Sequence, residues 1–143
     1  MLRYGRIGLL LVTLASLATG ATAEELDWEK YADVKVIDVV TVDPDGDLRK
    51  TPVWFVLLEG AAYLRTSRSR WLENIRRDPK VVIRIKDEEF PLLAHAVEGE
   101  EIIQRVDTAS REKYGWQEAM IHVFRFRTPD ILRLSSRRDR DDT

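Results

Sequence analysis

Residues 34–66, VKVIDVVTVDPDGDLRKTPVWFVLLEGAAYLRT, decide the fold. Short turn signals at Asp43–Gly46 and Glu59–Gly60 divide this stretch into three segments rich in β-branched and aromatic residues. Connections this short cannot serve a parallel crossover, so the three segments predict an antiparallel meander. Both faces of the first segment are largely apolar, and we expect it to be buried on both sides. The predicted strands are Val34–Val42, Thr51–Leu58 and Ala61–Thr66.

The rest of the chain continues this pattern with helices and further strands. Ser69 is a suitable N-cap for a helix that ends before Pro79, and Gly115 is placed to end a second one. A short amphipathic helical piece precedes the meander. The predicted elements are helical turns at Leu26–Ala32, helices from Ser69 to about Arg77 and over Glu100–Lys113, and strands at Lys80–Lys86, Phe90–Val97, Met120–Arg127 and Ile131–Leu134.

Six or seven antiparallel strands with two short helices predict an α+β fold. A helix follows the third strand and another follows the fifth. Closure of the sheet into a small barrel would remove exposed strand edges, which favours a barrel. An open sandwich is the alternative.

Composition limits the classes of function. The 143 residues are 44% hydrophobic and 34% charged, which is typical of one globular domain. The formal net charge is −2, so no overall field favours nucleic acid or an anionic membrane. Cysteine is absent, which excludes disulfides, thiolate nucleophiles and thiolate metal sites.

The N-terminus has the pattern of a secretory signal peptide. Arg3 and Arg6 precede the uncharged run Ile7–Ala18, and the small residues Ala21–Ala23 follow. We expect cleavage after Ala23, hence a periplasmic or secreted protein with no stable membrane insertion. An uncleaved membrane anchor is the alternative. Residues 24–143 would form the single domain, with 136–143 as a disordered tail.

The segment Arg65–Arg77 is the candidate binding site. It contains five arginines and one acid, Glu73, within a chain that is acidic overall. Guanidinium groups, hydroxyls and the unpaired N–H groups of a helix start are all suited to a phosphate or carboxylate. A solvated loop with surface ion pairs is the alternative interpretation.

Other motifs carry less chemistry. His95 and His122 are the only histidines, and neither has a carboxylate at metal-ligand spacing, so we predict no metal site. The acids around Gly46 alternate as calcium ligands do, but Trp54 stands where the loop needs Glu, which indicates a turn. No glycine-rich phosphate loop or G-x-S-x-G element is present, and no catalytic residue is predicted.

Several short motifs resemble one superfamily in their order along the chain. A basic residue followed by Thr-Pro and an aromatic-apolar strand resembles the pyridoxamine-phosphate-oxidase-like FMN-binding split barrels and the deazaflavin-dependent reductases, and most closely a bacterial family among them. The resemblance covers about Val34–Arg137. The motifs are Arg49–Val56, Ala62–Thr66, Asn74–Val81, Lys113–Gly115 and Leu132–Leu134.

This resemblance implies a split barrel that forms a homodimer, with FMN or a deazaflavin bound between the subunits. The cofactor phosphate would contact the turn after the third strand, and its ring or ribityl chain would lie near the second strand. In such proteins the redox chemistry belongs to the cofactor. The implied cofactor-binding residues are Arg49, Lys50, Thr51, Trp54, Arg65, Thr66, Ser67, Arg68 and Arg70.

Two functions follow from these observations. The first is an exported flavin-type oxidoreductase that acts on a small aromatic, quinone or nitro compound. The second is a non-catalytic exported dimeric module that binds another small anionic ligand. Binding of a polyanion through Arg65–Arg77 and the C-terminal arginines is disfavoured, because Asp139, Asp141 and Asp142 interleave with that tail. We therefore expect no nucleic-acid partner.

Overall fold

The computed structural model describes residues 26–115 and 129–140, so the strand predicted over Met120–Arg127 lies outside the described residues. None of the helices in the described ranges is long and apolar enough to cross a membrane. In chain order the elements are η1 (Trp28–Tyr31), β1 (Val36–Val42), β2 (Leu48–Leu58), β3 (Ala61–Thr66), α1 (Arg70–Arg77), β4 (Lys80–Ile85), β5 (Glu88–Val97), α2 (Glu100–Tyr114), β6 (Asp130–Ser136) and η2 (Arg137–Arg140).

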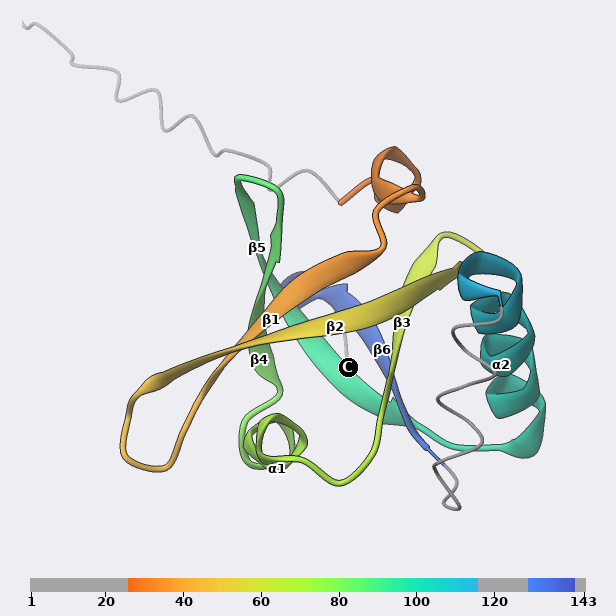
Figure 1. The fold of residues 1–143 in the computed structure, drawn as a ribbon. Helices are drawn as coiled ribbons and strands as arrows, with labels where there is room; N and C mark the ends of the chain where they lie inside the picture. The colour runs from red at the N-terminus through yellow and green to blue at the C-terminus, as the bar shows by residue number, and fades with distance from the viewer. Residues whose placement is uncertain (1–25, 116–128, 141–143) are drawn as a thin grey trace, which may run out of the picture.

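The described strands form one closed barrel in the order β1-β2-β3-β6-β5-β4, and neighbouring strands are antiparallel (Figure 1). Pairing of β1 with β4 completes the closure. Gly46 and Gly60 adopt φ of 92° and 77° in the two hairpin turns, a region that glycine enters without strain. The predicted α+β barrel with two helices is confirmed, and the open sandwich is wrong.

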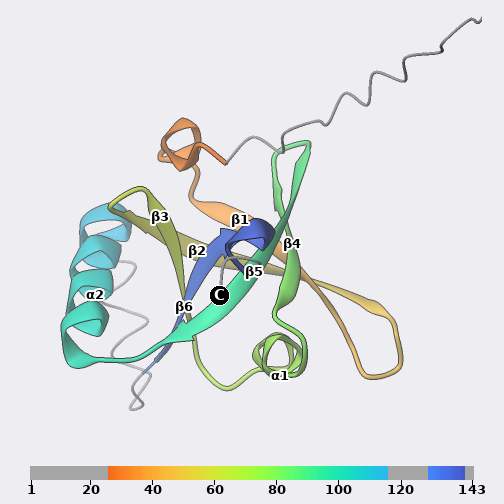
Figure 2. The same ribbon diagram turned by 180° about the vertical axis from the view of Figure 1, so that it is seen from behind.

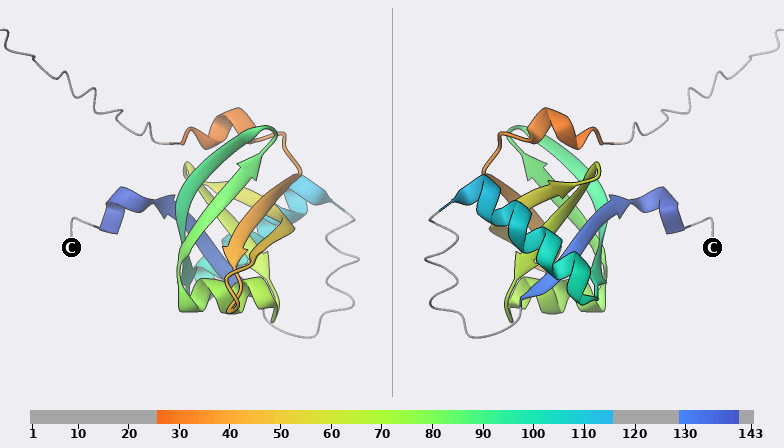
Figure 3. Two further views of the ribbon diagram at one scale, coloured as in Figure 1. Left: turned by 90° about the vertical axis from the view of Figure 1, so that its left-hand side faces the viewer. Right: turned by 90° about the vertical axis from the view of Figure 1, so that its right-hand side faces the viewer.

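Alternating side chains fill the interior of the barrel. On β4, Val81, Ile83 and Ile85 are at most 1% exposed, whereas the intervening Arg84 faces solvent. The helices η1 and α1 lie at opposite ends of the barrel (Figures 1 and 3). Trp28 and Trp71 extend from them into the same apolar cluster. Both ends of the core are thereby closed.

Helix α2 covers the outer face of β2, β3 and β6 (Figure 2). A second apolar cluster lies beneath it, with Val56 and Tyr63 from the strands and Val106 and Tyr114 from the helix. All four side chains are at most 9% exposed. Polar side chains on the same face of α2 therefore lie close to β2 and β3.

The strands β2 and β3 separate part of the way along. Their ladder ends at the pair Phe55–Leu64. Beyond it β2 pairs with β1, and the end of β3 pairs with β6. Figure 1 shows the two strands diverging toward the turn that leads into α1. This divergence places the start of α1 at the edge of the barrel.

Two expectations need correction. On β1, Ile37 and Val39 are at most 1% exposed, but Val36 and Val42 are 47% and 49% exposed. Val40, on the same face, is 8% exposed, so the middle of the strand is buried on both faces and its two ends are not. At the other end of the chain, the predicted tail begins inside β6 and continues as η2. The guanidinium of Arg137 explains this order, since it donates to strand carbonyls at 3.0 and 3.3 Å.

Candidate functional site

Side-chain hydroxyls build the turn between β3 and α1. The hydroxyl of Thr66, a residue 6% exposed, donates to the Ser67 carbonyl at 2.8 Å. Ser69 Oγ lies 3.3 Å from Thr66 Oγ1 and accepts the N–H of Leu72 at 3.4 Å, which makes Ser69 the N-cap of α1 as predicted. Thr66 and Ser69 therefore shape the turn. The Ser67 side chain is half-buried and forms no hydrogen bond with another described residue.

Arg68 and Arg70 are the exposed cations of this turn. Neither forms an ion pair with a described residue, whereas Arg76, further along α1, pairs with Asp130 at 3.1 Å. The first turn of α1 adds backbone N–H groups at the positive end of the helix dipole. The donors available to an anion here are thus two guanidinium groups, a hydroxyl and backbone amides.

Arg65 faces away from this turn, toward α2. Its Nε lies 3.2 Å from Asp107 Oδ1, and the two side chains are only 16% and 24% exposed. One of its terminal nitrogens lies 3.5 Å from Ser110 Oγ. Neither Asp107 nor Ser110 was predicted as a site residue from the sequence. Their spacing of three residues, which places both side chains on one face of α2, was the only sign in the sequence that they could act together.

Trp54 forms an aromatic pair with Tyr114 of α2. The ring centroids are 4.3 Å apart and the planes differ by 7°. The Tyr114 hydroxyl accepts the N–H of Phe55 at 3.0 Å and lies 2.8 Å from the carbonyl oxygens of Phe55 and Lys35. Burial raises the pKa of Tyr114 to about 12. One face of Trp54 is therefore covered by a fixed, neutral phenol.

Lys113 lies beside this aromatic pair. Its Nζ is 3.6 Å from the centroid of the Phe55 ring and donates to the Phe55 carbonyl at 3.1 Å. Burial, and to a smaller extent the neighbouring Lys35 ammonium, lower the pKa of Lys113 to about 8. Lys35 in turn donates to the Lys113 carbonyl at 2.8 Å, where a cation suits the end of α2.

This environment predicts that Lys113 loses its proton at lower pH than an ordinary lysine. Trace acylation with acetic anhydride, quantified for each lysine by peptide mass spectrometry, should give a midpoint near pH 8 for Lys113. Substitution Lys35→Met removes the neighbouring positive charge and should move that midpoint upward. A midpoint at the ordinary lysine value of 10.5 in the unmodified sequence would contradict this assignment.

Arg49 is engaged in a polar network beneath α1. Its guanidinium binds the Asp43 carboxylate through two hydrogen bonds of 2.8 and 2.6 Å. Asn74, which is 3% exposed, donates to Asp43 at 2.7 Å and to the Thr41 hydroxyl at 3.0 Å. These contacts join the β1–β2 hairpin to α1. In this arrangement Arg49 supports the fold next to the candidate site.

Lys50 and Thr51, also predicted as site residues, lie on the half of β2 that pairs with β1. Lys50 Nζ is 3.9 Å from the carboxylate of Asp38, and the two side chains are 58% and 33% exposed. Thr51 is half-buried opposite Val39 of β1. The structure therefore distributes the nine predicted residues over three places: the β3–α1 turn, the seam under α2, and the β1–β2 hairpin.

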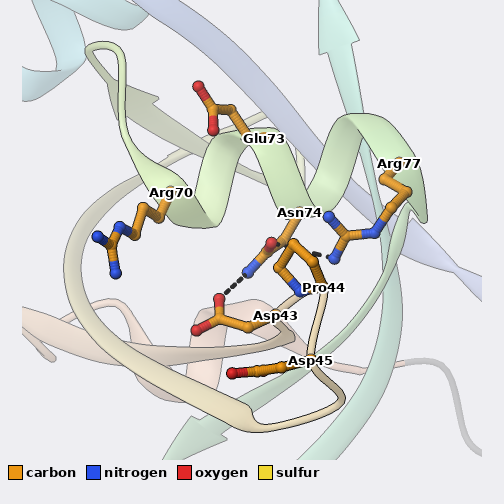
Figure 4. A pocket seen from close by; sticks show the side chains of 7 residues that line it. All are labelled: Asp43, Pro44, Asp45, Arg70, Glu73, Asn74 and Arg77. Atoms are coloured by element: carbon orange, nitrogen blue, oxygen red, sulfur yellow. Dashed lines mark hydrogen bonds between the residues drawn. The ribbon is translucent and has the colours of Figure 1, made fainter.

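A pocket of about 360 Å³ lies between the β1–β2 turn and α1 (Figure 4). Arg70 links this pocket to the β3–α1 turn, and Figure 4 shows it on the helix at the opposite side of the pocket from Arg77. Acidic and basic groups alternate on its wall, so it differs from the purely cationic and hydroxyl donors of the turn. Its lining residues are Asp43, Pro44, Asp45, Arg70, Glu73, Asn74 and Arg77.

Acid should weaken the network around Asp43. The Arg49 guanidinium, and next the Asn74 amide, hold the pKa of Asp43 down to about 2. Because the folded-state pKa lies below the ordinary value of 3.8, this carboxylate stabilises the fold above that value and loses its contribution as the pH falls toward 2. Asp43→Asn should therefore destabilise the protein at neutral pH, with a difference from wild type that shrinks in acid.

Urea unfolding at pH 7 and between pH 4 and pH 2 measures this difference. Asp45→Asn is the matched control, since Asp45 lies in the same turn and acts on Arg49 only through its charge, while its carboxylate accepts the N–H of Asp47. An Asp43→Asn penalty that stays constant down to pH 2 would contradict the assignment.

Metal ligands do not gather in the described ranges. No group of three or more histidine and acidic side chains there is arranged to hold a metal ion. His95 is exposed on β5, and His122 lies outside the described residues.

Comparison with known proteins identifies the family of this chain and shows which solved structures share its fold. The model of the F420H(2)-dependent quinone reductase family matches residues 33–121, a range that contains the β3–α1 turn and most of the barrel. No curated protein matches the chain.

Three solved structures illustrate the shared fold. An F420-H2 dependent reductase is 20% identical over 71% of this chain and 95% of its own, with a TM-score of 0.59. A candidate pyridoxamine 5'-phosphate oxidase from Listeria innocua is 20% identical over 72% and 84%, with a TM-score of 0.52. HutZ, a heme storage protein from Vibrio cholerae, is 20% identical over 76% and 86%, with a TM-score of 0.61. The barrel is thus the split barrel that the sequence motifs indicated.

Proposed function

Because this chain belongs to the F420H(2)-dependent quinone reductase family, we propose that it is a flavin-type oxidoreductase that uses a deazaflavin or FMN. Its substrate would be a small aromatic, quinone or nitro compound. The observation that carries the proposal is the donor set of Ser67, Arg68 and Arg70 at the start of α1, inside the range that the family model matches.

These donors fit the phosphate of such a cofactor. Two guanidinium groups offer fork-shaped, permanently charged donors, and the first turn of α1 offers backbone N–H groups. Thr66 and Ser69 fix the shape of the turn through hydrogen bonds of 2.8 to 3.4 Å. A site that is formed before binding loses less conformational entropy when the anion binds.

The cofactor, when bound, supplies the two-electron transfer. The residues of this chain bind and orient it. Lys50, Thr51 and Trp54 lie on the part of β2 that diverges from β3, which suits contact with the ring or ribityl chain. Stacking on Tyr114 holds the Trp54 ring in one orientation. No residue is assigned as a catalytic acid or base.

Export and dimerisation belong to the same proposal. Residues 1–23 support secretion to the periplasm or beyond, and the family resemblance supports a homodimer that binds its cofactor between subunits. Intact mass of the exported protein tests the first point, since cleavage after Ala23 leaves a chain that begins at Glu24. Light scattering on that processed chain tests the second.

Cofactor binding tests the function directly. The processed protein is titrated in parallel with FMN, with F420 and with heme, while absorbance and fluorescence are followed. Saturable, micromolar binding of FMN or F420 together with reduction of a quinone supports the proposal. Binding of heme without binding of either flavin-type cofactor would favour a non-catalytic module for another small anionic ligand. If none of the three ligands binds, both the oxidoreductase hypothesis and the hypothesis of a non-catalytic ligand-binding module are wrong.

A further inference from the structure

We propose that the pocket between the β1–β2 turn and α1 binds a small zwitterion, a molecule with one ammonium and one carboxylate, through Asp45 and Arg70. The ammonium would contact the Asp45 carboxylate on the turn, and the carboxylate would contact the Arg70 guanidinium on the helix. The inference goes beyond the proposed function and shares only Arg70 with it. The volume of about 360 Å³ lies within the range of about 300–1,000 Å³ that is typical of small-molecule pockets.

The floor of the pocket is built from side chains that already have partners. Both carboxylate oxygens of Asp43 accept hydrogen bonds from the Arg49 guanidinium, and one of them also accepts the Asn74 amide at 2.7 Å. Asn74 is 3% exposed, and its oxygen accepts a hydrogen bond from Arg77 at 3.1 Å. These contacts fix the turn against the helix. A ligand must therefore be recognised by the other charged groups on the wall.

Three exposed charged side chains on the wall form no ion pair with a described residue: Asp45, Arg70 and Glu73. One carboxylate oxygen of Asp45 accepts the N–H of Asp47 at 3.0 Å, and the other has no hydrogen-bond partner among the described residues. In Figure 4 the Asp45 carboxylate and the Arg70 guanidinium extend toward the same side of the view, one from the turn and one from the helix. A ligand bound to both would bridge the two elements.

The signs of these charges favour a ligand that carries both signs. Two acids and one arginine have a net charge of −1, which disfavours a simple anion. A simple cation is attracted by the acids but repelled by Arg70. The charge of Arg70 does act across the pocket, because it lowers the pKa of Asp43 in addition to the larger effects of Arg49 and Asn74. A zwitterion places each of its charges beside an opposite charge.

Solvated surface charges without a ligand would behave differently. In that case a zwitterion would bind no more tightly than a compound of similar size that carries only one of its two charges. The ratio of these affinities therefore separates a binding site from an ordinary charged surface.

The test follows backbone amide chemical shifts of the isotope-labelled protein at constant ionic strength, with no cofactor present. The zwitterionic probes are glycine, 4-aminobutanoate and 6-aminohexanoate, which differ in the separation of their charges. Butyrate and butylammonium are the single-charge probes. At least one zwitterion should bind saturably at residues 43–46 and 70–77, about fivefold more tightly than either single-charge probe, the order expected for one further ion pair near solvent. Equal affinities, or shifts confined to other residues, would overturn the inference.

Two variants with matched controls test the assigned residues. Asp45→Asn should weaken binding of the zwitterion about fivefold without weakening that of butyrate. Asp47→Asn is its control, because it removes the same charge from the same turn and Asp47 is not among the residues that line the described pocket. Arg70→Ala should weaken binding of the zwitterion and of butyrate, whereas Arg76→Ala, on the same helix but outside this lining, should change neither.

The outcome is independent of the proposed function. Equal effects of Asp45→Asn and Asp47→Asn on the zwitterion would overturn the inference, even if FMN or F420 binds normally. A preference for the zwitterion that depends on Asp45 and Arg70, in a protein that binds neither FMN nor F420, would support the inference and overturn the proposed function.

Discussion

Replacing Phe55 by alanine is expected to lower the free energy of unfolding by about 3–5 kcal/mol, the usual cost of truncating a large buried aromatic side chain. Phe55 is 1% exposed, and its ring centroid lies 5.9 Å from that of Trp28 in η1. The ammonium of Lys113 packs 3.6 Å from the same centroid. The substitution would therefore leave a cavity where the N-terminal helix and α2 both contact the barrel.

Urea unfolding followed by circular dichroism measures this loss. Phe55→Leu is the matched variant, because it keeps an apolar side chain and the backbone contacts of Phe55 with Tyr114. Because it leaves a smaller cavity than alanine does, it should lower the free energy of unfolding by clearly less than Phe55→Ala, on the order of 1.5 kcal/mol. A loss below about 1 kcal/mol in Phe55→Ala would show that this ring does not link η1 and α2 to the barrel.

Removing both exposed arginines of the β3–α1 turn is expected to weaken binding of the cofactor by about 100-fold. Each of Arg68→Ala and Arg70→Ala should weaken it by about tenfold, since loss of one charge-assisted contact costs about 1.5–3 kcal/mol. The fold should be little affected, because both side chains are exposed, neither forms an ion pair with a described residue, and the charge of Arg70 is the smallest of the influences on Asp43. Calorimetric titration with FMN and with F420 measures the effect.

Arg76→Ala is the control for this pair. Arg76 is an exposed arginine near the other end of α1, where it pairs with Asp130 at 3.1 Å. Arg76→Ala changes the net charge by the same amount as Arg68→Ala or Arg70→Ala alone. It should alter the cofactor affinity by less than twofold. Equal losses in Arg76→Ala and Arg70→Ala would mean that overall charge, and not the turn, attracts the ligand.

The fold could be predicted because its local signals agree with one another. The turn at Asp43–Gly46 and the strand Ala61–Thr66 were predicted where the structure has them, and Ser69 caps α1 as expected. The exposure of Val36 and Val42 was not predictable, because it depends on which elements cover the outer face of β1. That is a property of tertiary packing and leaves no periodic signal in the strand itself.

The candidate site was predictable only in part. The arginines and hydroxyls of the turn are contiguous in sequence, so their clustering was visible. The partners that hold Arg49 and Arg65 were not visible, because they depend on how the chain folds. Asp43 lies across the β1–β2 turn from Arg49, and Asp107 lies on α2, far from Arg65 in sequence. Tyr114 was named only as part of a family motif, although it covers one face of Trp54 and binds the backbone of β2.

The proposed function requires the β3–α1 turn to hold the phosphate of a flavin-type cofactor. The most direct measurement is an amide chemical-shift titration of the isotope-labelled, processed protein with FMN and then with F420. We expect the largest phosphate-dependent shifts at the backbone amides of residues 67–71, and we expect that riboflavin, which lacks the phosphate, does not produce them. Saturable binding that leaves these amides unchanged, with the largest shifts on β5 or around Asp43 instead, would contradict it.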